Sequence, residues 1–205
     1  MKVKNLIFDF GKVLVDYDVM SVMHTFFGDN KEEEEAFSQT FMCKKFTDEC
    51  DLEEIPFEQI IRKAQQEHPR FSDALQYFYD HYLDFVIGEM PGMKPLLVKL
   101  KEKGFKLYGL TNWCSEVHKV MKKYDIFDLL DGYVISSEVH LLKPNPAIYR
   151  YLCNRYGLKP EECLFVDDNY ANVYAAKDVG MYAVAFVGPE IYEIAVKNIC
   201  FNDRT

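Results

Sequence analysis

Residues 164–169 read LFVDDN, a short apolar run that ends in two carboxylates and an amide. Two other stretches have the same form: residues 6–9 read LIFD, and residues 107–112 read LYGLTN. Short runs rich in Leu, Ile, Val and Phe are typical of buried parallel strands. Because ligands of open α/β sheets bind at the carboxyl ends of the strands, we expect these polar residues to lie together.

From Gly88 onward, helical and strand patterns alternate along the chain. We expect helices over 93–103, 115–123 and 170–179, a helix that opens at Asn145-Pro146, and strands over 105–110, 133–136, 163–166 and 182–187. Such alternation indicates βαβ units and a parallel sheet. The expected fold class is therefore α/β, with a Rossmann-like core of three layers.

A helical block separates the first strand from the others. Apolar residues at helical spacing predict helices over 19–27, 32–41, 57–64 and 75–82, and no strand is expected between Val19 and Val86. We expect a core formed by 1–16 and 89–205 and an inserted helical cap from 17 to 88, with hinges near 16–18 and 88–92.

Composition excludes several classes of function. The formal net charge of −9 disfavours nonspecific binding to nucleic acid or to an anionic membrane. No segment has the roughly 20 apolar residues of a membrane-spanning helix, and the first residues lack the features of a signal peptide. The six cysteines form no C-x-x-C pair, which is typical of reduced thiols. We expect a cytoplasmic protein that is a monomer or a weak dimer.

Asp9, Asp167 and Asp168 are the candidate metal ligands. Asp9 alone also fits a turn or a helix cap, but Asp167-Asp168 adds two carboxylates at the predicted sheet edge. Crowded carboxylates repel one another unless one is protonated or a cation lies among them. Mg²⁺ prefers oxygen ligands and keeps several waters, so these residues predict a magnesium site.

Thr111, Asn112 and Lys143 are the candidate phosphate-binding residues. None of the three residues alone is strong evidence for a phosphate site. Lys143 is the weakest, because a single lysine before a proline is more often solvated. A cation, a lysine and short hydrogen-bond donors together can hold phosphate oxygens. A carboxylate such as Asp9 beside them can accept a phosphoryl group and pass it to water.

The residues resemble the haloacid dehalogenase-like hydrolases. Four stretches are similar to the motifs of that superfamily, in order and spacing: LIFDFGKVL at 6–14, LTN at 110–112, Lys143 in LLKPNPAIY, and FVDDNYANV at 165–173. The helical insertion after the first strand is similar to the cap of that superfamily.

The resemblance implies a role for each motif residue. Asp9 would be the nucleophile and a magnesium ligand, the Gly11 carbonyl a second ligand and Asp168 a third, with Asp167 holding metal-bound waters or Lys143. Thr111, Asn112 and Lys143 would bind the phosphoryl group. Asn172 either ties the fourth loop together or lies on a helix surface.

Gly11 departs from the pattern, because typical phosphatases of this superfamily have a second Asp two residues after the nucleophile. A glycine cannot transfer a proton to the leaving group. The stretch DFGKVLVDYD is similar to bacterial sugar-phosphate phosphatases with a D-x-G-x-V first motif. Asp16 and Asp18 are candidates for a substitute acid, or structural residues of the hinge.

Three functions fit these residues. The first is a magnesium-dependent phosphatase that forms an aspartyl phosphate from a small phosphomonoester, such as a sugar 1-phosphate with its better leaving group. The second is a 2-haloacid dehalogenase, which also lacks the second Asp but usually has small neutral residues in place of Asp167-Asp168. The third is a catalytically silent protein that binds a phosphate ligand or a protein partner. The acidic pair favours the phosphatase.

Overall fold

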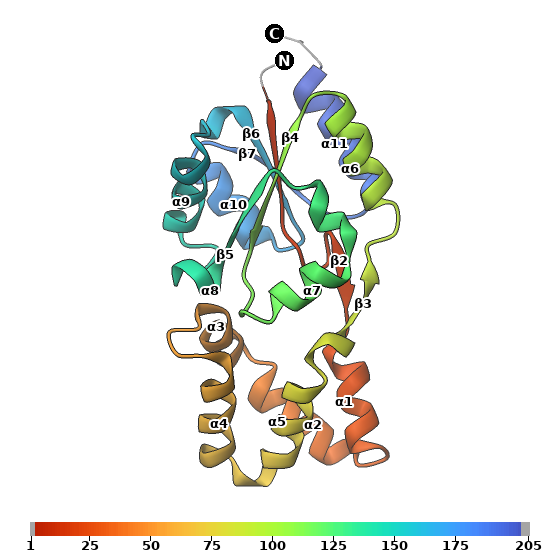
Figure 1. The fold of residues 1–205 in the computed structure, drawn as a ribbon, viewed down its shortest axis with the longest axis vertical. Helices are drawn as coiled ribbons and strands as arrows, with labels where there is room; N and C mark the ends of the chain where they lie inside the picture. The colour runs from red at the N-terminus through yellow and green to blue at the C-terminus, as the bar shows by residue number, and fades with distance from the viewer. Residues whose placement is uncertain (1–2, 202–205) are drawn as a thin grey trace.

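A parallel sheet forms the centre of the molecule in the computed structural model, which describes residues 3–201 (Figure 1). Within that range the main sheet has five strands in the order β5-β4-β1-β6-β7. The strands are β1 (Asn5–Phe8), β4 (Lys106–Thr111), β5 (Gly132–Ile135), β6 (Cys163–Asp167) and β7 (Tyr182–Ala185). The parallel α/β fold predicted from the sequence is confirmed, with the first strand in the middle.

Helices cover both faces of this sheet (Figure 1). Leu6 and Phe8 point into one hydrophobic cluster, beneath α6 (Met93–Glu102), α7 (Val117–Lys123) and α11 (Pro189–Phe201). Ile7 points into the other, beneath α9 (Pro146–Tyr156) and α10 (Tyr170–Asp178). A strand buried on both faces must be apolar throughout, which explains the continuous LIF run. In the described part of the chain, no helix is both long and apolar enough to cross a membrane.

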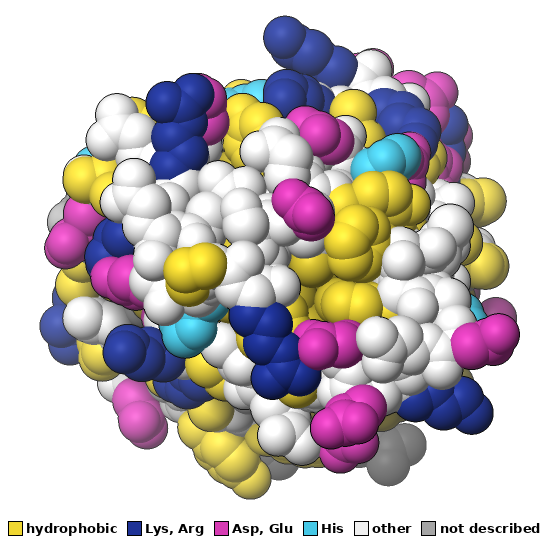
Figure 2. Space-filling view, turned by 90° about the horizontal axis from the view of Figure 1, so that it is seen from below, with side chains coloured by type: hydrophobic (Ala, Val, Ile, Leu, Met, Phe, Trp, Pro, Cys, Tyr) yellow, Lys and Arg dark blue, Asp and Glu magenta, His cyan; other side chains and the backbone are white. Residues whose placement is uncertain are grey.

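Five helices follow β1 and form the cap at one end of the molecule. They are α1 (Val19–Phe27), α2 (Lys31–Phe41), α3 (Lys44–Leu52), α4 (Phe57–Glu67) and α5 (Ser72–Asp80). Their apolar stripes face inward, and the aromatic rings of Phe37, Phe41 and Phe71 pack together at centroid distances of 5.0 to 5.9 Å. Seen from the cap end, acidic and basic side chains surround a small hydrophobic area (Figure 2).

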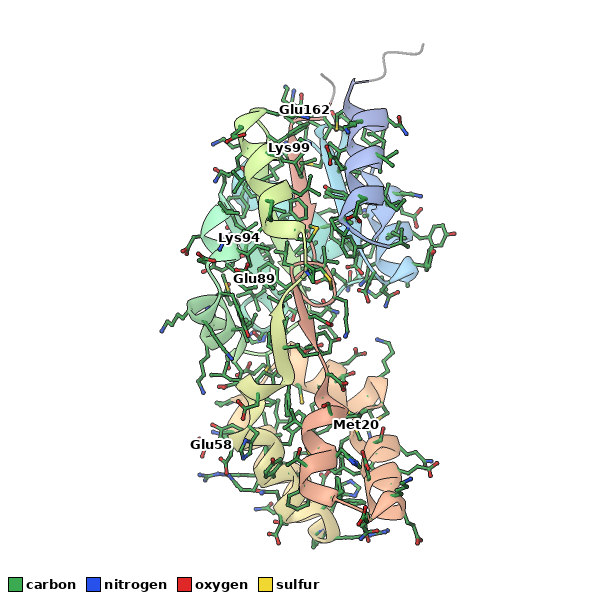
Figure 3. The ribbon with its side chains drawn as sticks, turned by 90° about the vertical axis from the view of Figure 1, so that its right-hand side faces the viewer. Met20, Glu58, Glu89, Lys94, Lys99 and Glu162 are labelled. Carbon is green, nitrogen blue, oxygen red and sulfur yellow. The ribbon has the colours of Figure 1, made fainter. Side chains whose placement is uncertain are left out.

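A two-stranded antiparallel ribbon joins the cap to the core. It consists of β2 (Val15–Tyr17) and β3 (Val86–Glu89), and a 3₁₀ turn at Tyr82–Phe85 leads into β3. The helical pattern did not predict this ribbon, because strands of three or four residues show too little alternation. The boundaries expected after residues 16 and 88 lie within the ribbon and stay predictions. Glu89 ends the ribbon, and Lys94 lies in the first turn of α6 (Figure 3).

Candidate active site

The strand register brings the polar residues to one edge of the sheet. Phe8 of β1 lies opposite both Gly109 of β4 and Val166 of β6, so the residues that follow these strands are neighbours. Glu162, just before β6, lies at the end of the molecule away from the cap residues Met20 and Glu58 (Figure 3). The carboxyl ends of the strands therefore face the cap, where an α/β sheet places its ligands.

Lys143 is a buried cation between two carboxylates. Its Nζ lies 2.9 Å from Oδ1 of Asp9 and 2.6 Å from Oδ2 of Asp167. Burial lowers the pKa of Lys143, but the charges of Asp9 and Asp167 outweigh it, so the pKa is raised overall and the lysine stays charged. A lysine that sequence alone could not separate from a solvated one is thus part of the site.

Asp9 has one engaged oxygen and one open oxygen. Its Oδ1 accepts hydrogen bonds from the backbone N–H of Phe10 (2.7 Å) and from Lys143. Among residues 3–201, no group donates to Oδ2. Burial raises the pKa of Asp9 to about 7, with Lys143 acting against it and Asp167 in the same direction. Additional positive charge nearby would keep this carboxylate ionised and able to attack.

Asp167 is held from several directions at once. Its carboxylate accepts from the backbone N–H of Asn169 (2.8 Å), from Nδ2 of Asn172 (3.1 Å to each oxygen) and from Lys143. Asn172 is buried, and its carbonyl oxygen accepts from the hydroxyl of Tyr149 at 2.9 Å. Of the two roles open for Asn172, the structure shows that it ties the fourth loop together. Asp167 faces Lys143, and each of its two oxygens accepts two hydrogen bonds.

The donor set fits a hard divalent cation. One oxygen from each of Asp9, Asp167 and Asp168 lies within 4.8 Å of the others. Desolvation and the neighbouring charge of Asp167 raise the pKa of Asp168, as expected for carboxylates that repel one another. Asp168 and Gly11 line the same cavity as Asp9.

Thr111 and Asn112 follow β4 and line the same cavity. Asn112 exchanges two hydrogen bonds with the backbone of Lys143: its Nδ2 donates to the carbonyl oxygen at 2.9 Å and its Oδ1 accepts from the N–H at 2.8 Å. This pair fixes the lysine loop against the end of β4. The hydroxyl of Thr111 has no hydrogen-bond partner in the described part of the protein, so it is free to bind a ligand.

A cavity of about 320 Å³ lies between these residues and the cap, a size that suits a small molecule. Its floor includes Asp9, Gly11, Thr111, Asn112 and Asp168. The cap side and the ribbon are largely apolar and aromatic: the lining includes Tyr17, Val19, Phe41, Met42, Phe46, Phe78, Tyr82 and Phe85, together with the polar residues Thr47 and Asp51. Phe41 and Phe46 therefore face the cavity as well as the cap interior.

The two candidate acids near the hinge point elsewhere. Asp16 accepts a hydrogen bond from Nζ of Lys12 at 2.6 Å, and Asp18 caps α1 by accepting from the N–H of Ser21 at 3.0 Å. Neither residue lines the cavity. Asp51 does, although it stands in the acidic stretch 48–54 where no spacing distinguishes it from a solvated residue. Only the folded cap shows where it lies.

Comparison with known proteins shows relatives that are phosphatases. The chain is 32% identical over 122 residues to a phosphoglycolate phosphatase of Mannheimia succiniciproducens, covering 59% of this chain and 54% of that protein. It is 28% identical over 134 residues to a glyceraldehyde 3-phosphate phosphatase of Pyrococcus furiosus, covering 63% and 55% respectively. The matched part thus spans about half the length of these curated relatives.

Solved structures show the same fold. A HAD family enzyme of Bacteroides thetaiotaomicron superposes with a TM-score of 0.76 at 20% identity, over 95% of this chain and 98% of that one. Its complex with magnesium and inorganic phosphate gives a TM-score of 0.68 at 22% identity, over 89% and 93%. Residues 3–180 match the family of haloacid dehalogenase-like hydrolases. The match covers the cap and the sheet edge where the four motifs meet, and the chain belongs to that hydrolase family.

Proposed function

We propose that this chain is a magnesium-dependent phosphatase, which hydrolyses a small phosphomonoester through an aspartyl phosphate on Asp9. One observation carries the proposal: the buried Lys143 lies 2.9 Å from Asp9, and Asp9 lines a cavity together with Thr111 and Asp168. A nucleophilic carboxylate, a fixed cation and a free hydroxyl are what phosphoryl transfer requires at one place.

The residues of the chain have separate tasks in this reaction. Asp9, Asp168 and the carbonyl of Gly11, with Asp167 beside them, would hold Mg²⁺, which supplies positive charge for the phosphate oxygens. Lys143, Thr111 and Asn112 bind the phosphoryl oxygens. Oδ2 of Asp9 attacks phosphorus, and the bond from phosphorus to the ester oxygen breaks. Water then attacks the aspartyl phosphate, which releases phosphate and restores the carboxylate.

The lining of the cavity favours an uncharged organic group on the substrate. Among the described residues that line it there is no lysine or arginine, whereas Asp51 and several aromatic rings face the space. The carboxylate of a substrate such as phosphoglycolate would find no counter-charge on the cap side. We therefore favour an uncharged phosphomonoester, such as a sugar phosphate, with sugar 1-phosphates first among those to test.

The acidic residues at the sheet edge disfavour the alternative of a 2-haloacid dehalogenase. That reaction displaces halide from carbon without a metal ion, and its substrate carries a carboxylate. Asp168 and Asp167 would repel such a substrate at the place where a phosphatase needs a cation. For the activity proposed here we expect a cytoplasmic enzyme that is a monomer or a weak dimer.

Phosphate release from a panel of phosphomonoesters, with and without Mg²⁺, tests the proposal. We expect turnover only with Mg²⁺ and a loss of more than about 10³-fold in Asp9→Asn, because the nucleophile is removed. Asp29→Asn, an exposed carboxylate in a turn of the cap, is the matched control and should keep full activity. Calorimetric titration should show weaker Mg²⁺ binding in Asp168→Asn.

The alternatives have their own signatures in the same experiments. Metal-independent turnover, or full activity in Asp9→Asn, contradicts the aspartyl phosphate route. Halide release from 2-chloropropionate identifies a dehalogenase. Binding of Mg²⁺ and phosphate without turnover of any ester identifies a catalytically silent binding protein.

A further inference from the structure

Position 11 cannot supply the acid for the leaving group, and the structure shows what occupies the space instead. A Cβ atom built on Gly11 would lie 2.8 Å from Cε1 of Tyr17, closer than side chains approach. The ring of Tyr17 thus fills the volume where a second acidic side chain would begin. Any acid for the leaving group must come from another part of the cavity.

Most proton donors in the cavity are unsuited to this task. Burial raises the pKa of Tyr17 to about 12, and it also raises the pKa of the Cys50 thiol. The hydroxyl of Tyr82 lies 2.8 Å from Nε1 of Trp113 and 3.1 Å from Sγ of Cys114, and burial raises its pKa as well. A general acid works best when its pKa is near the working pH, which none of these groups satisfies.

Asp51 is the remaining acidic side chain of the lining that lies on the cap side. It stands near the end of α3 and borders the same cavity as Asp9 and Thr111. No residue in the described range 3–201 donates a hydrogen bond to its carboxylate. Asp9 and Asp168 belong to the floor of the cavity, opposite the cap. A phosphomonoester bound to this floor would therefore present its ester oxygen toward the cap.

Three contacts hold the Asp51 segment on the core. The carbonyl oxygen of Asp51 accepts from Oγ of Ser136 at 2.6 Å, and the carbonyl oxygen of Leu52 lies 2.8 Å from Nδ1 of His140. The carboxylate of Glu53 accepts from the Oγ of Ser115 at 2.7 Å. These contacts join the end of α3 to the loop after β4 and to the short helix α8 (Ser136–Val139), with the residue that follows it, after β5. The segment is therefore fixed relative to Asp9, as a catalytic group requires.

The charges around Asp51 favour its protonated form near neutral pH. Burial raises its pKa to about 7, the charge of Asp48 on the same helix adds to this, and Lys143 and Lys44 act in the opposite direction. A carboxylic acid with this pKa is protonated in a large fraction of molecules at pH 6 to 7, where it can donate a proton.

We propose that Asp51 is the general acid of the reaction and takes the place of the acid that Gly11 lacks. As the bond between phosphorus and the ester oxygen breaks, its electron pair stays on that oxygen, which takes the proton of Asp51. The Asp51 carboxylate then takes a proton from the water that attacks the aspartyl phosphate, which restores the acid. This role rests on the proposed phosphatase function.

Leaving-group dependence tests the role of Asp51. An alkyl phosphate needs a proton on its leaving oxygen, whereas p-nitrophenyl phosphate has a leaving group that departs as an anion. For Asp51→Asn we expect kcat/KM to fall about 10²-fold or more for an alkyl phosphate and less than about threefold for the aryl phosphate. The limb of the pH profile that falls above pH 7 with the alkyl ester should also disappear.

Two controls separate this role from a structural one. Glu49→Gln changes a carboxylate on the same helix that is paired with Lys63, and it should leave both esters unaffected. Trp113 is the only tryptophan in the chain and lines the cavity, so its fluorescence reports phosphate binding. The affinity for inorganic phosphate with Mg²⁺ should stay within about threefold in Asp51→Asn, because an acid for the leaving group does not bind the phosphoryl group.

Each result decides one question. Equal losses for both esters, or no loss for either, overturn the role of Asp51 and leave the phosphatase function intact. Failure of the wild-type protein to release phosphate from any ester overturns the proposed function, and the role of Asp51 with it. A large loss for the alkyl ester alone, with phosphate binding retained, supports the role.

Discussion

The two walls of the cavity, the floor at the sheet edge and the wall formed by the cap, differ in the kinds of residues that line them. The floor consists mainly of charged and polar residues, and the buried Lys143 forms ion pairs with Asp9 of this floor and with Asp167. The cap wall consists mainly of aromatic and apolar residues, with Asp51 as its acidic group. The difference indicates a division of labour: the floor performs phosphoryl transfer, and the cap selects the organic group and provides the proton.

Substitution of the charged groups around Asp9 should cost the most, because the removal of one of them leaves a buried charge without its partner. Lys143→Met exposes Asp9 and Asp167 to each other with no cation between them. We expect kcat/KM to fall by about 10²–10³-fold or more for every ester. The free energy of unfolding should fall by about 3 kcal/mol or more, because uncompensated charges remain buried.

Urea unfolding at pH 8 and steady-state kinetics measure these two effects. Lys177→Met is the control, since Lys177 is exposed on α10 and its Nζ lies 5.7 Å from the centroid of the Tyr174 ring. It should change the stability by less than about 0.5 kcal/mol. A Lys143→Met protein that keeps its stability and loses activity for alkyl esters alone would contradict the division between floor and cap.

Substitution of Asp51 in the cap should raise the stability, whereas substitution of Lys143 lowers it. The reason is that the buried carboxyl group of Asp51 destabilises the folded state when it is charged. Its pKa of about 7 lies above the ordinary value of 3.8, so the folded protein binds this proton more tightly than the unfolded chain. The resulting stability is fully present below pH 4 and is lost as the pH rises through 7. Above pH 7 the folded state holds a poorly solvated charge.

Asp51→Asn should therefore be more stable than the wild type at pH 8, and the difference should shrink as the pH falls toward 4. A gain of about 1 kcal/mol corresponds to about 2–4 °C in the melting temperature of a chain of this size. Thermal unfolding at pH 5 and pH 8 measures it, with Glu49→Gln as the control. A difference in melting temperature that does not change with pH would refute the assignment of the raised pKa to Asp51.

The two walls also differ in how far sequence could predict them. The floor was predicted because three short apolar runs end in polar residues, and parallel strands bring such ends together. The register of β1 against β4 and β6 confirmed that arrangement. The sequence does not decide the role of Asn172, because its contacts with Asp167 depend on how the loop after β6 turns.

The cap wall could not be predicted in the same way. Helix α3 is mostly polar and buries only Cys50, so it shows no apolar stripe in the sequence. The position of Asp51 depends on Ser136, which is 85 residues away and anchors the end of this helix. The sequence pattern does not predict the ribbon of β2 and β3, because its strands are short. Contacts between distant segments, rather than local pattern, decide these features.

The smallest expected effect comes from placing an acidic side chain on the floor at position 11. From sequence alone, Gly11→Asp is expected to speed the hydrolysis of alkyl phosphates more than that of sugar 1-phosphates, provided that the fold tolerates it. The contact of 2.8 Å between a Cβ at Gly11 and the ring of Tyr17 changes that expectation, because the ring would have to move first. We expect Gly11→Asp alone to lower activity for all esters, and its combination with Tyr17→Ala to restore it.

Placed in the Asp51→Asn background, the pair Gly11→Asp and Tyr17→Ala tests whether either wall can supply the proton. A carboxyl group on the floor should recover the alkyl phosphate reaction by about tenfold and leave the p-nitrophenyl phosphate reaction unchanged, since only the alkyl oxygen needs protonation. Tyr17→Ala in the same background is the control and should recover neither. Faster hydrolysis of both esters would mean that Tyr17 limits access to Asp9. The supply of a proton would then not be the function that distinguishes the cap wall from the floor.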